Sequence, residues 1–88
     1  MKEDVIKLEC MLNSLSFGKE IQGKSLGGIV ITKSRNQIHI GYCYGYYGLL
    51  NYHEYFNTAK DAVKWLSRKG VSVCDLKVGY DPSLFNGL

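Results

Sequence analysis

Two histidines and a tyrosine stand where neighbouring strands of a sheet would bring them together. His39 lies in one β-branched and aromatic stretch, and His53 and Tyr55 lie in the next one. An imidazole titrates near neutral pH, so this pair beside Tyr55 and Lys33 could perform acid–base chemistry of the ribonuclease kind. The spacing matches no catalytic motif, however, and we expect a protein that is not an enzyme. A small His-dependent, nuclease-like enzyme stays as the second alternative.

A metal site is the other chemistry that these residues suggest. His39 and His53 with Cys43 would supply imidazole and thiolate ligands, but the spacing places no further ligand beside them. The three cysteines, Cys10, Cys43 and Cys74, form no CxxC pair, which excludes a zinc ribbon and a thioredoxin-type motif. We therefore expect no metal and no other cofactor, and we expect idle thiols in a reducing compartment.

The elements that must position these side chains follow from the apolar pattern. Residues 3–16 carry an apolar stripe at the helical period, and a second helix begins at Asn57 or Thr58 and ends at Gly70. Short β-branched or alternating stretches predict the strands, at residues 28–33, 37–44, 49–56 and 71–78, and the loop at 18–28 leaves room for a short strand at 20–22. The order α-β-β-β-α-β predicts a two-layer α+β fold. In it, two helices cover one face of a three- or four-stranded antiparallel sheet.

Side-chain parity sorts the tyrosine-rich segment between Gly41 and Phe56, which holds six of the chain's seven tyrosines. Successive side chains of a strand point to opposite faces, so a register that pairs even with even positions sends the apolar set under the helices. The set expected in the core is Ile38, Ile40, Tyr42, Tyr44, Leu50, Tyr52 and Phe56. The set expected on the open face is His39, Gly41, Cys43, Asn51, His53 and Tyr55. Tyr46 and Tyr47 fall at the tip of the turn between the strands, where aromatic side chains suit contact with a partner.

The size and charge of the chain limit its class of function. Its 88 residues make one domain, residues 1–88. The net charge is +3, and the pI of 8.8 falls just short of the range of a dedicated nucleic-acid binder. The N-terminus lacks the pattern of a signal peptide, and no apolar run reaches the ~20 residues of a membrane span. We expect a soluble, cytoplasmic protein without membrane contact.

A basic stripe on the second predicted helix favours a different kind of partner. Lys60, Lys64 and Arg68 recur at every fourth position, opposite the apolar stripe, where they could follow the phosphates of a nucleic acid. The open sheet face is the other candidate surface, and Lys33 and Arg35 on the first predicted hairpin would contribute to binding if that face binds an anion. A nucleic-acid-binding module is therefore the first alternative.

The segment that leads into the second helix resembles two families of DNA-binding domains. Phe56, Thr58 and Ala62 match the Phe-x-Thr-x-x-x-Ala helix that follows a three-stranded sheet in AP2-type and integrase N-terminal domains. The order α-β-β-β-α is also similar to that of double-stranded-RNA-binding domains. These resemblances imply a topology and not a function, because the strands carry Tyr, Gly and His where the DNA-binding families carry Arg, Lys and Trp.

The function that we expect is binding without catalysis. A small stand-alone domain that leaves one sheet face open and carries aromatic residues at the tip of a turn is typical of inhibitors that phages and mobile elements encode. We expect it to inhibit or regulate a protein or ribonucleoprotein complex, such as a host-defence complex in the host cytoplasm, by occupying its surface. An exposed strand edge could also pair with that of a second copy and form a homodimer. The expected contact residues are His39, Tyr46, Tyr47, Asn51, His53 and Tyr55.

Overall fold

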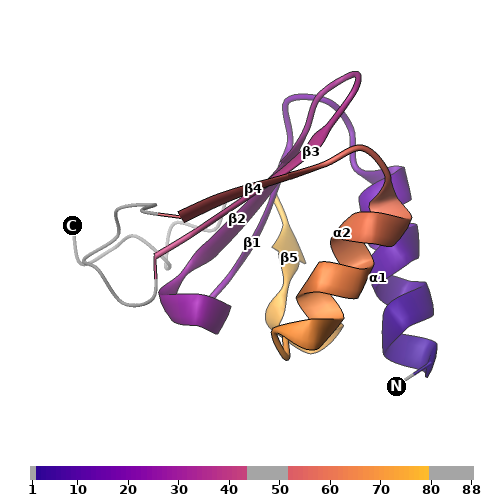
Figure 1. Ribbon diagram of the computed structural model, residues 1–88. Helices are drawn as coiled ribbons and strands as arrows, with labels where there is room; N and C mark the ends of the chain where they lie inside the picture. Colours follow the sequence, from indigo (N-terminus) through magenta and orange to yellow (C-terminus); the bar gives the residue numbers. More distant parts are fainter. Residues whose placement is uncertain (1, 44–51, 80–88) are drawn as a thin grey trace.

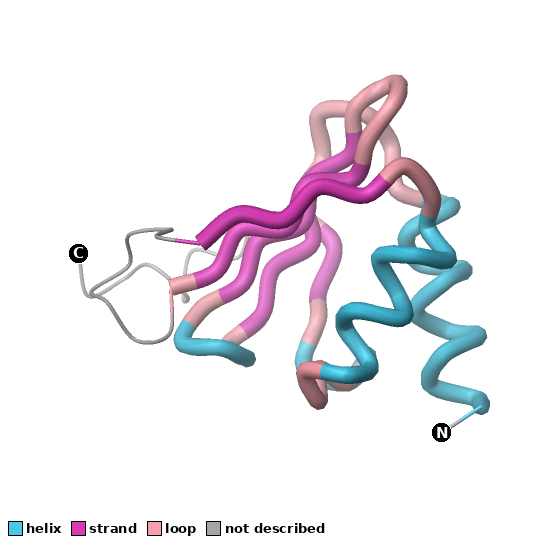
Figure 2. Tube along the Cα trace, in the orientation of Figure 1, coloured by secondary structure: helices cyan, strands magenta, loops and turns pink. Residues whose placement is uncertain are grey.

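The computed structural model describes residues 2–43 and 52–79, which form a two-layer α+β fold (Figure 1). Both helices lie on one face of an antiparallel sheet, as Figure 2 also shows. In the described part of the chain the sheet has five strands, in the order β4-β3-β2-β1-β5. The helices and strands are α1 (Lys2–Ser14), β1 (Glu20–Gly23), β2 (Ile29–Lys33), β3 (Ile38–Tyr42), β4 (Tyr52–Phe56), α2 (Ala59–Arg68) and β5 (Lys77–Val78).

The predicted fold class is confirmed, with one strand more than expected. The additional strand is β1, the short strand for which the loop at residues 18–28 left room, and it pairs with β2 on one side and with β5 on the other. Its residue Ile21 is fully buried, so this short strand anchors the glycine-rich loop to the core. The two helices cover the predicted face, and the helix expected at residues 3–16 ends at Ser14.

The prediction of a strand over residues 71–78 is largely wrong. A 3₁₀ turn, η2 (Val73–Asp75), occupies the middle of this stretch, and β5 has two residues. Ser72 begins the turn, because its Oγ accepts a hydrogen bond from the Cys74 amide at 3.2 Å. A side chain that bonds to a nearby amide offers the backbone an alternative to the strand ladder.

Asp75 ties η2 to the start of another 3₁₀ turn, η1 (Ser25–Gly27). Its carboxylate accepts hydrogen bonds from the amide of Lys24 at 3.2 Å and from the amide of Ser25 at 2.8 Å. Gly23 makes this approach possible, since a Cβ atom there would lie 2.6 Å from Asp75 Oδ2. The contact joins parts of the chain that are 50 positions apart.

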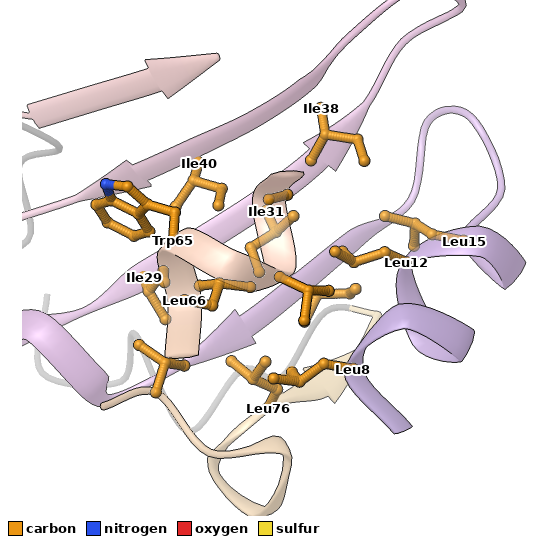
Figure 3. Packing of buried hydrophobic residues seen from close by; sticks show 14 of the residues in the cluster. Leu8, Leu12, Leu15, Ile29, Ile31, Ile38, Ile40, Trp65, Leu66 and Leu76 are labelled. Atoms are coloured by element: carbon orange, nitrogen blue, oxygen red, sulfur yellow. The ribbon is translucent and has the colours of Figure 1, made fainter. Parts of the chain in front are cut away.

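The core lies between the sheet and the two helices (Figure 3). Large apolar side chains point into it from both layers, and burying each one stabilises the fold by about 1.5–3 kcal/mol. Its buried members are Leu8, Leu12, Leu15, Ile21, Ile29, Ile31, Ile38, Ile40, Tyr42, Ala62, Val63, Trp65, Leu66, Val71 and Leu76.

Parity assigns the core residues of β3 correctly, and Phe56 of β4 is partly buried against the core as predicted, but Tyr52 of β4 is not a core residue. Tyr42 is buried as predicted, whereas Tyr52 is 41% exposed. The reason is that β4 is the edge strand, and its Tyr52 packs against the neighbouring strand instead, with its ring 5.2 Å from that of Tyr42. Tyr44 and Leu50 lie outside the described residues.

Both ends of α2 are fixed by local hydrogen bonds. Thr58 is the N-cap, as predicted, and its Oγ1 accepts a hydrogen bond from the Asp61 amide at 3.1 Å. Gly70 has a φ of 77°, and the following amide of Val71 donates to the carbonyl of Leu66 at 3.0 Å. This is the bond of a Schellman motif, and it ends the helix after Arg68.

Candidate functional site

His39, His53 and Tyr55 lie together on the sheet face opposite the helices, and we call them the ring cluster. In the register of β3 and β4, His39 stands opposite Tyr55 and Gly41 stands opposite His53. The predicted pairing of even with even positions is therefore confirmed. Gly41 has no side chain, so the two histidines can approach each other diagonally across the strands.

The two imidazoles are directly hydrogen bonded. His39 Nε2 lies 2.8 Å from His53 Nδ1, while the ring centroids are 5.0 Å apart and the ring planes differ by 18°. The centroid separation is the length of the bond plus one ring radius on each side, so the rings meet edge to edge. Tyr55 packs against the same pair, with its ring centroid 4.9 Å from that of His39.

Thr32 of β2 lies behind the pair. Its Oγ1 is 3.5 Å from His39 Nδ1, which is the nitrogen that His53 does not contact. The hydroxyl can donate or accept, so it is compatible with either tautomer of His39. Sequence reasoning missed Thr32, although the alternation of Ile29 and Ile31 into the core places it on the open face.

The environment of His39 favours the neutral imidazole. Partial burial lowers the pKa of His39 from its ordinary value, and the nearby charge of His53 lowers it further. Both causes act in the same direction, because a cationic His39 would lose solvation and would face a second cation across the bond. Both causes therefore favour a neutral His39 beside His53.

The ring cluster is accessible on this face. Tyr55 is 60% exposed, His53 is exposed and His39 is half-buried. Towards β1, Gln22 is 2% exposed and donates a hydrogen bond to Glu20 at 2.9 Å. A partner would therefore meet the ring cluster and not the middle of the sheet.

Lys33, which the nuclease-like alternative would need beside the histidines, does not lie at this site. It points to the helical side, where its Nζ donates to the carbonyls of Leu12 at 3.3 Å and Asn13 at 3.2 Å. Carbonyls of the last helical turn lack partners within the helix, and a lysine is a suitable donor for them. The acid–base set of two histidines, tyrosine and lysine is therefore not assembled.

Cys43 was predicted on the open face but is buried, at 2% exposure. Its Sγ lies 3.3 Å from the carbonyl of Gly27 and 3.4 Å from that of Gly28, so it is enclosed by the loop before β2. It cannot join the histidines as a ligand. No group of three or more potential metal ligands occurs within residues 2–43 and 52–79.

Three of the predicted contact residues cannot be placed. Tyr46, Tyr47 and Asn51 lie outside the described residues, and their role in binding stays a prediction.

The predicted basic residues do not form one surface. Lys60, Lys64 and Arg68 are exposed on α2, in the layer opposite the ring cluster. Arg35 is exposed in the turn between β2 and β3, and Lys33 is engaged by α1. The ring cluster and the cations of α2 therefore belong to different sides of the molecule.

A groove of about 710 Å³ runs between α1 and α2 beside the basic residues. Its lining residues are Val5, Glu9, Phe56, Lys60, Asp61, Val63, Lys64, Ser67 and Arg68.

The helices in the described part of the chain are too short and too polar to cross a membrane.

The chain has no match among known protein families, curated proteins or solved structures. The functional argument therefore depends on the geometry of its own residues.

Proposed function

We propose that this chain is a non-enzymatic binding protein that inhibits or regulates a partner macromolecule by occupying its surface. The observation that supports this best is the ring cluster on the sheet face opposite the helices. Tyr55 is 60% exposed there, although it packs directly against His39. Exposed, pre-ordered aromatic side chains of this kind are common anchors of protein interfaces, because they bury a large area and lose little conformational entropy.

A protein surface is a better partner for this face than a nucleic acid. In the register of the described strands, Lys77 at the far β5 edge is the basic residue that shares the face with the histidines. A nucleic-acid site combines stacking rings with cations that neutralise phosphates. Here the cations of α2 lie in the other layer, so the two requirements are not met on one face.

The geometry also disfavours the nuclease-like alternative. Acid–base cleavage of a phosphodiester needs one group on each side of the reacting phosphate. The imidazoles of His39 and His53 are bonded to each other at 2.8 Å, which leaves no room for a substrate between them. Lys33, the expected cation of that site, is held at the end of α1.

A quantitative capture experiment tests the proposal. The wild-type chain and a His53→Ala/Tyr55→Ala variant serve as baits in lysate with and without nuclease treatment, and a Lys60→Ala/Lys64→Ala/Arg68→Ala variant is the control. We expect a protein partner that the wild type and the control retain and that the His53/Tyr55 variant loses. Retention of every partner by the His53/Tyr55 variant would contradict the proposal, and loss of all binding after nuclease treatment would favour a nucleic acid. The predicted tip residues are tested in the same way with Tyr46→Ala/Tyr47→Ala.

A further inference from the structure

The groove between α1 and α2 has an apolar floor that the fold leaves open. Val5, Phe56 and Val63 line it, and Val63 is buried at 2% exposure. Val5 is 40% exposed, although the apolar stripe to which it belongs continues into the core at Leu8. The α1 stripe therefore ends in the groove with an apolar side chain that the helical layer does not cover.

One wall of the groove carries evenly spaced cations. Lys60, Lys64 and Arg68 are exposed and follow one another at every fourth position of α2, which places them about 6 Å apart along the helix axis. Glu9 and Asp61 also line the groove. Within the described residues, however, no carboxylate forms an ion pair with any of the three cations. Their charges are therefore available to an external anion.

We propose that this groove binds an acidic amphipathic helix of a partner protein. Acidic side chains at positions i, i+4 and i+8 of such a helix repeat at the same spacing of about 6 Å and would face Lys60, Lys64 and Arg68. Its apolar side would then cover Val5 and Phe56, in the manner of a helix that docks into a groove between two others.

Other occupants match the groove less well. A phosphate backbone would use the cations but would leave Val5 and Phe56 exposed to water. A small carboxylate could reach the apolar floor, but it would pair with one of the three cations and leave the other two without an anion. The proposal concerns a different surface from the ring cluster, so it does not depend on the function proposed above.

The test uses a designed peptide as the probe. The peptide is fluorescein-labelled, blocked at both ends and about 18 residues long, which is enough for a helix to form on binding. It carries leucines on one face and glutamates at i, i+4 and i+8 beside them. Two control peptides keep its length: one scatters the same leucines around the helix, and the other replaces the glutamates by lysines. Binding to the full chain is measured by fluorescence anisotropy.

We expect saturable binding of the designed peptide and no comparable binding of either control peptide. Lys64→Glu/Arg68→Glu should weaken binding by about tenfold or more, since it replaces two attractions by two repulsions. Val5→Ser should also weaken it, because it removes apolar area from the floor. Arg35→Glu, a charge reversal in the turn between β2 and β3, should leave binding within about twofold of the wild type. His53→Ala/Tyr55→Ala should bind the peptide like the wild type, and this variant separates the groove from the ring cluster.

Several results would overturn the proposal. Equal binding of the scattered-leucine peptide would show that charge alone attracts the probe, as would an equal loss in Arg35→Glu. Tighter binding of a DNA or RNA oligonucleotide that displaces the peptide would assign the cations to a nucleic acid. Thermal unfolding of each variant establishes that it is folded, and a folded Lys64→Glu/Arg68→Glu variant with unchanged affinity would exclude the groove.

Discussion

His39 Nε2 and His53 Nδ1 are 2.8 Å apart, so one proton lies between the two imidazoles. Protonation of both rings would remove the acceptor of this bond and place two cations next to each other. Burial and the neighbouring His53 therefore both oppose protonation of the half-buried His39, and its pKa lies below the ordinary value.

Removal of His53 should raise the pKa of His39. Burial lowers this pKa first, and the charge of His53 lowers it further. The variant His53→Ala removes the charge and also uncovers one edge of the His39 ring, so both causes become weaker. The pKa should move towards the ordinary value of 6.5 in an NMR titration of the imidazole proton signals. Lys60→Ala, in the other layer, is the control and should leave it unchanged. An unchanged pKa in His53→Ala would show that His53 does not influence the titration, and a lower one would show that His53 stabilises the cationic form of His39.

Folding stability should decrease as the pH falls from 7 towards 5. The pKa of His39 is lower in the folded chain than its ordinary value of 6.5, so the unfolded chain binds more protons between these two values. Stability therefore rises with pH in this window, is fully present above 6.5 and is lost as the pH falls towards the folded pKa. Urea unfolding at several pH values measures this. His39→Asn should show a flatter profile, and an equally steep one would assign the slope to other groups.

Asp75→Asn should destabilise the chain at neutral pH but not in acid. Partial burial raises the pKa of Asp75, but hydrogen bonds from Ser25 and Lys24 outweigh it, and the net shift is downward. The stability that the carboxylate provides is present above its ordinary pKa of 3.8 and is lost as the pH falls through the lower folded value. The amide variant has one acceptor oxygen for two backbone donors, so we expect a loss of about 1–2 kcal/mol at pH 7. The unfolding free energies of the two chains should converge below the folded pKa, and a constant difference at all pH values would contradict this role.

Gly23→Ala should destabilise the fold by about 1–3 kcal/mol through overpacking. The new Cβ would lie 2.6 Å from Asp75 Oδ2, 2.8 Å from Leu76 Cδ2 and 2.9 Å from the Asp75 carbonyl oxygen. A double-mutant cycle with Asp75→Ala measures the coupling, since that change removes the nearest atom but keeps the carbonyl. The double variant should be more stable than the sum of the single effects predicts. Additive effects would show that Gly23 and Asp75 act independently.

The sequence predicts those parts of the fold that local pattern determines. The alternation in β3 and β4 placed His39, His53 and Tyr55 on one face, because a shift by one residue would move Ile38 and Ile40 out of the core. The cap of α2 at Thr58 was also predictable, since its hydrogen bond joins residues three positions apart.

Long-range contacts explain what the sequence did not predict. The hydrogen bonds of Asp75 cross 50 positions of the chain, and no local pattern indicates that its partner is the amide of Ser25. Tyr52 has the parity of a core residue, but its exposure depends on how far the helical layer extends over the edge strand. The hydrogen bonds of Lys33 could not be predicted either, because its partners at the end of α1 are 20 and 21 positions away.

Lys33 should stabilise the fold, whereas Arg35, two positions later, should not. The ammonium group of Lys33 donates to the carbonyls of Leu12 and Asn13, while the side chain of Arg35 is exposed in the turn. Lys33→Met keeps most of the apolar stem and removes the donor, so we expect a loss of about 1 kcal/mol in unfolding free energy. Faster hydrogen exchange should accompany it in the last turn of α1, where the freed carbonyls allow the helix to fray. Arg35→Met is the matched control and should change neither measurement. If Lys33 instead contacts a nucleic acid, Lys33→Met would reduce the salt dependence of oligonucleotide binding by about one phosphate contact and leave the stability unchanged.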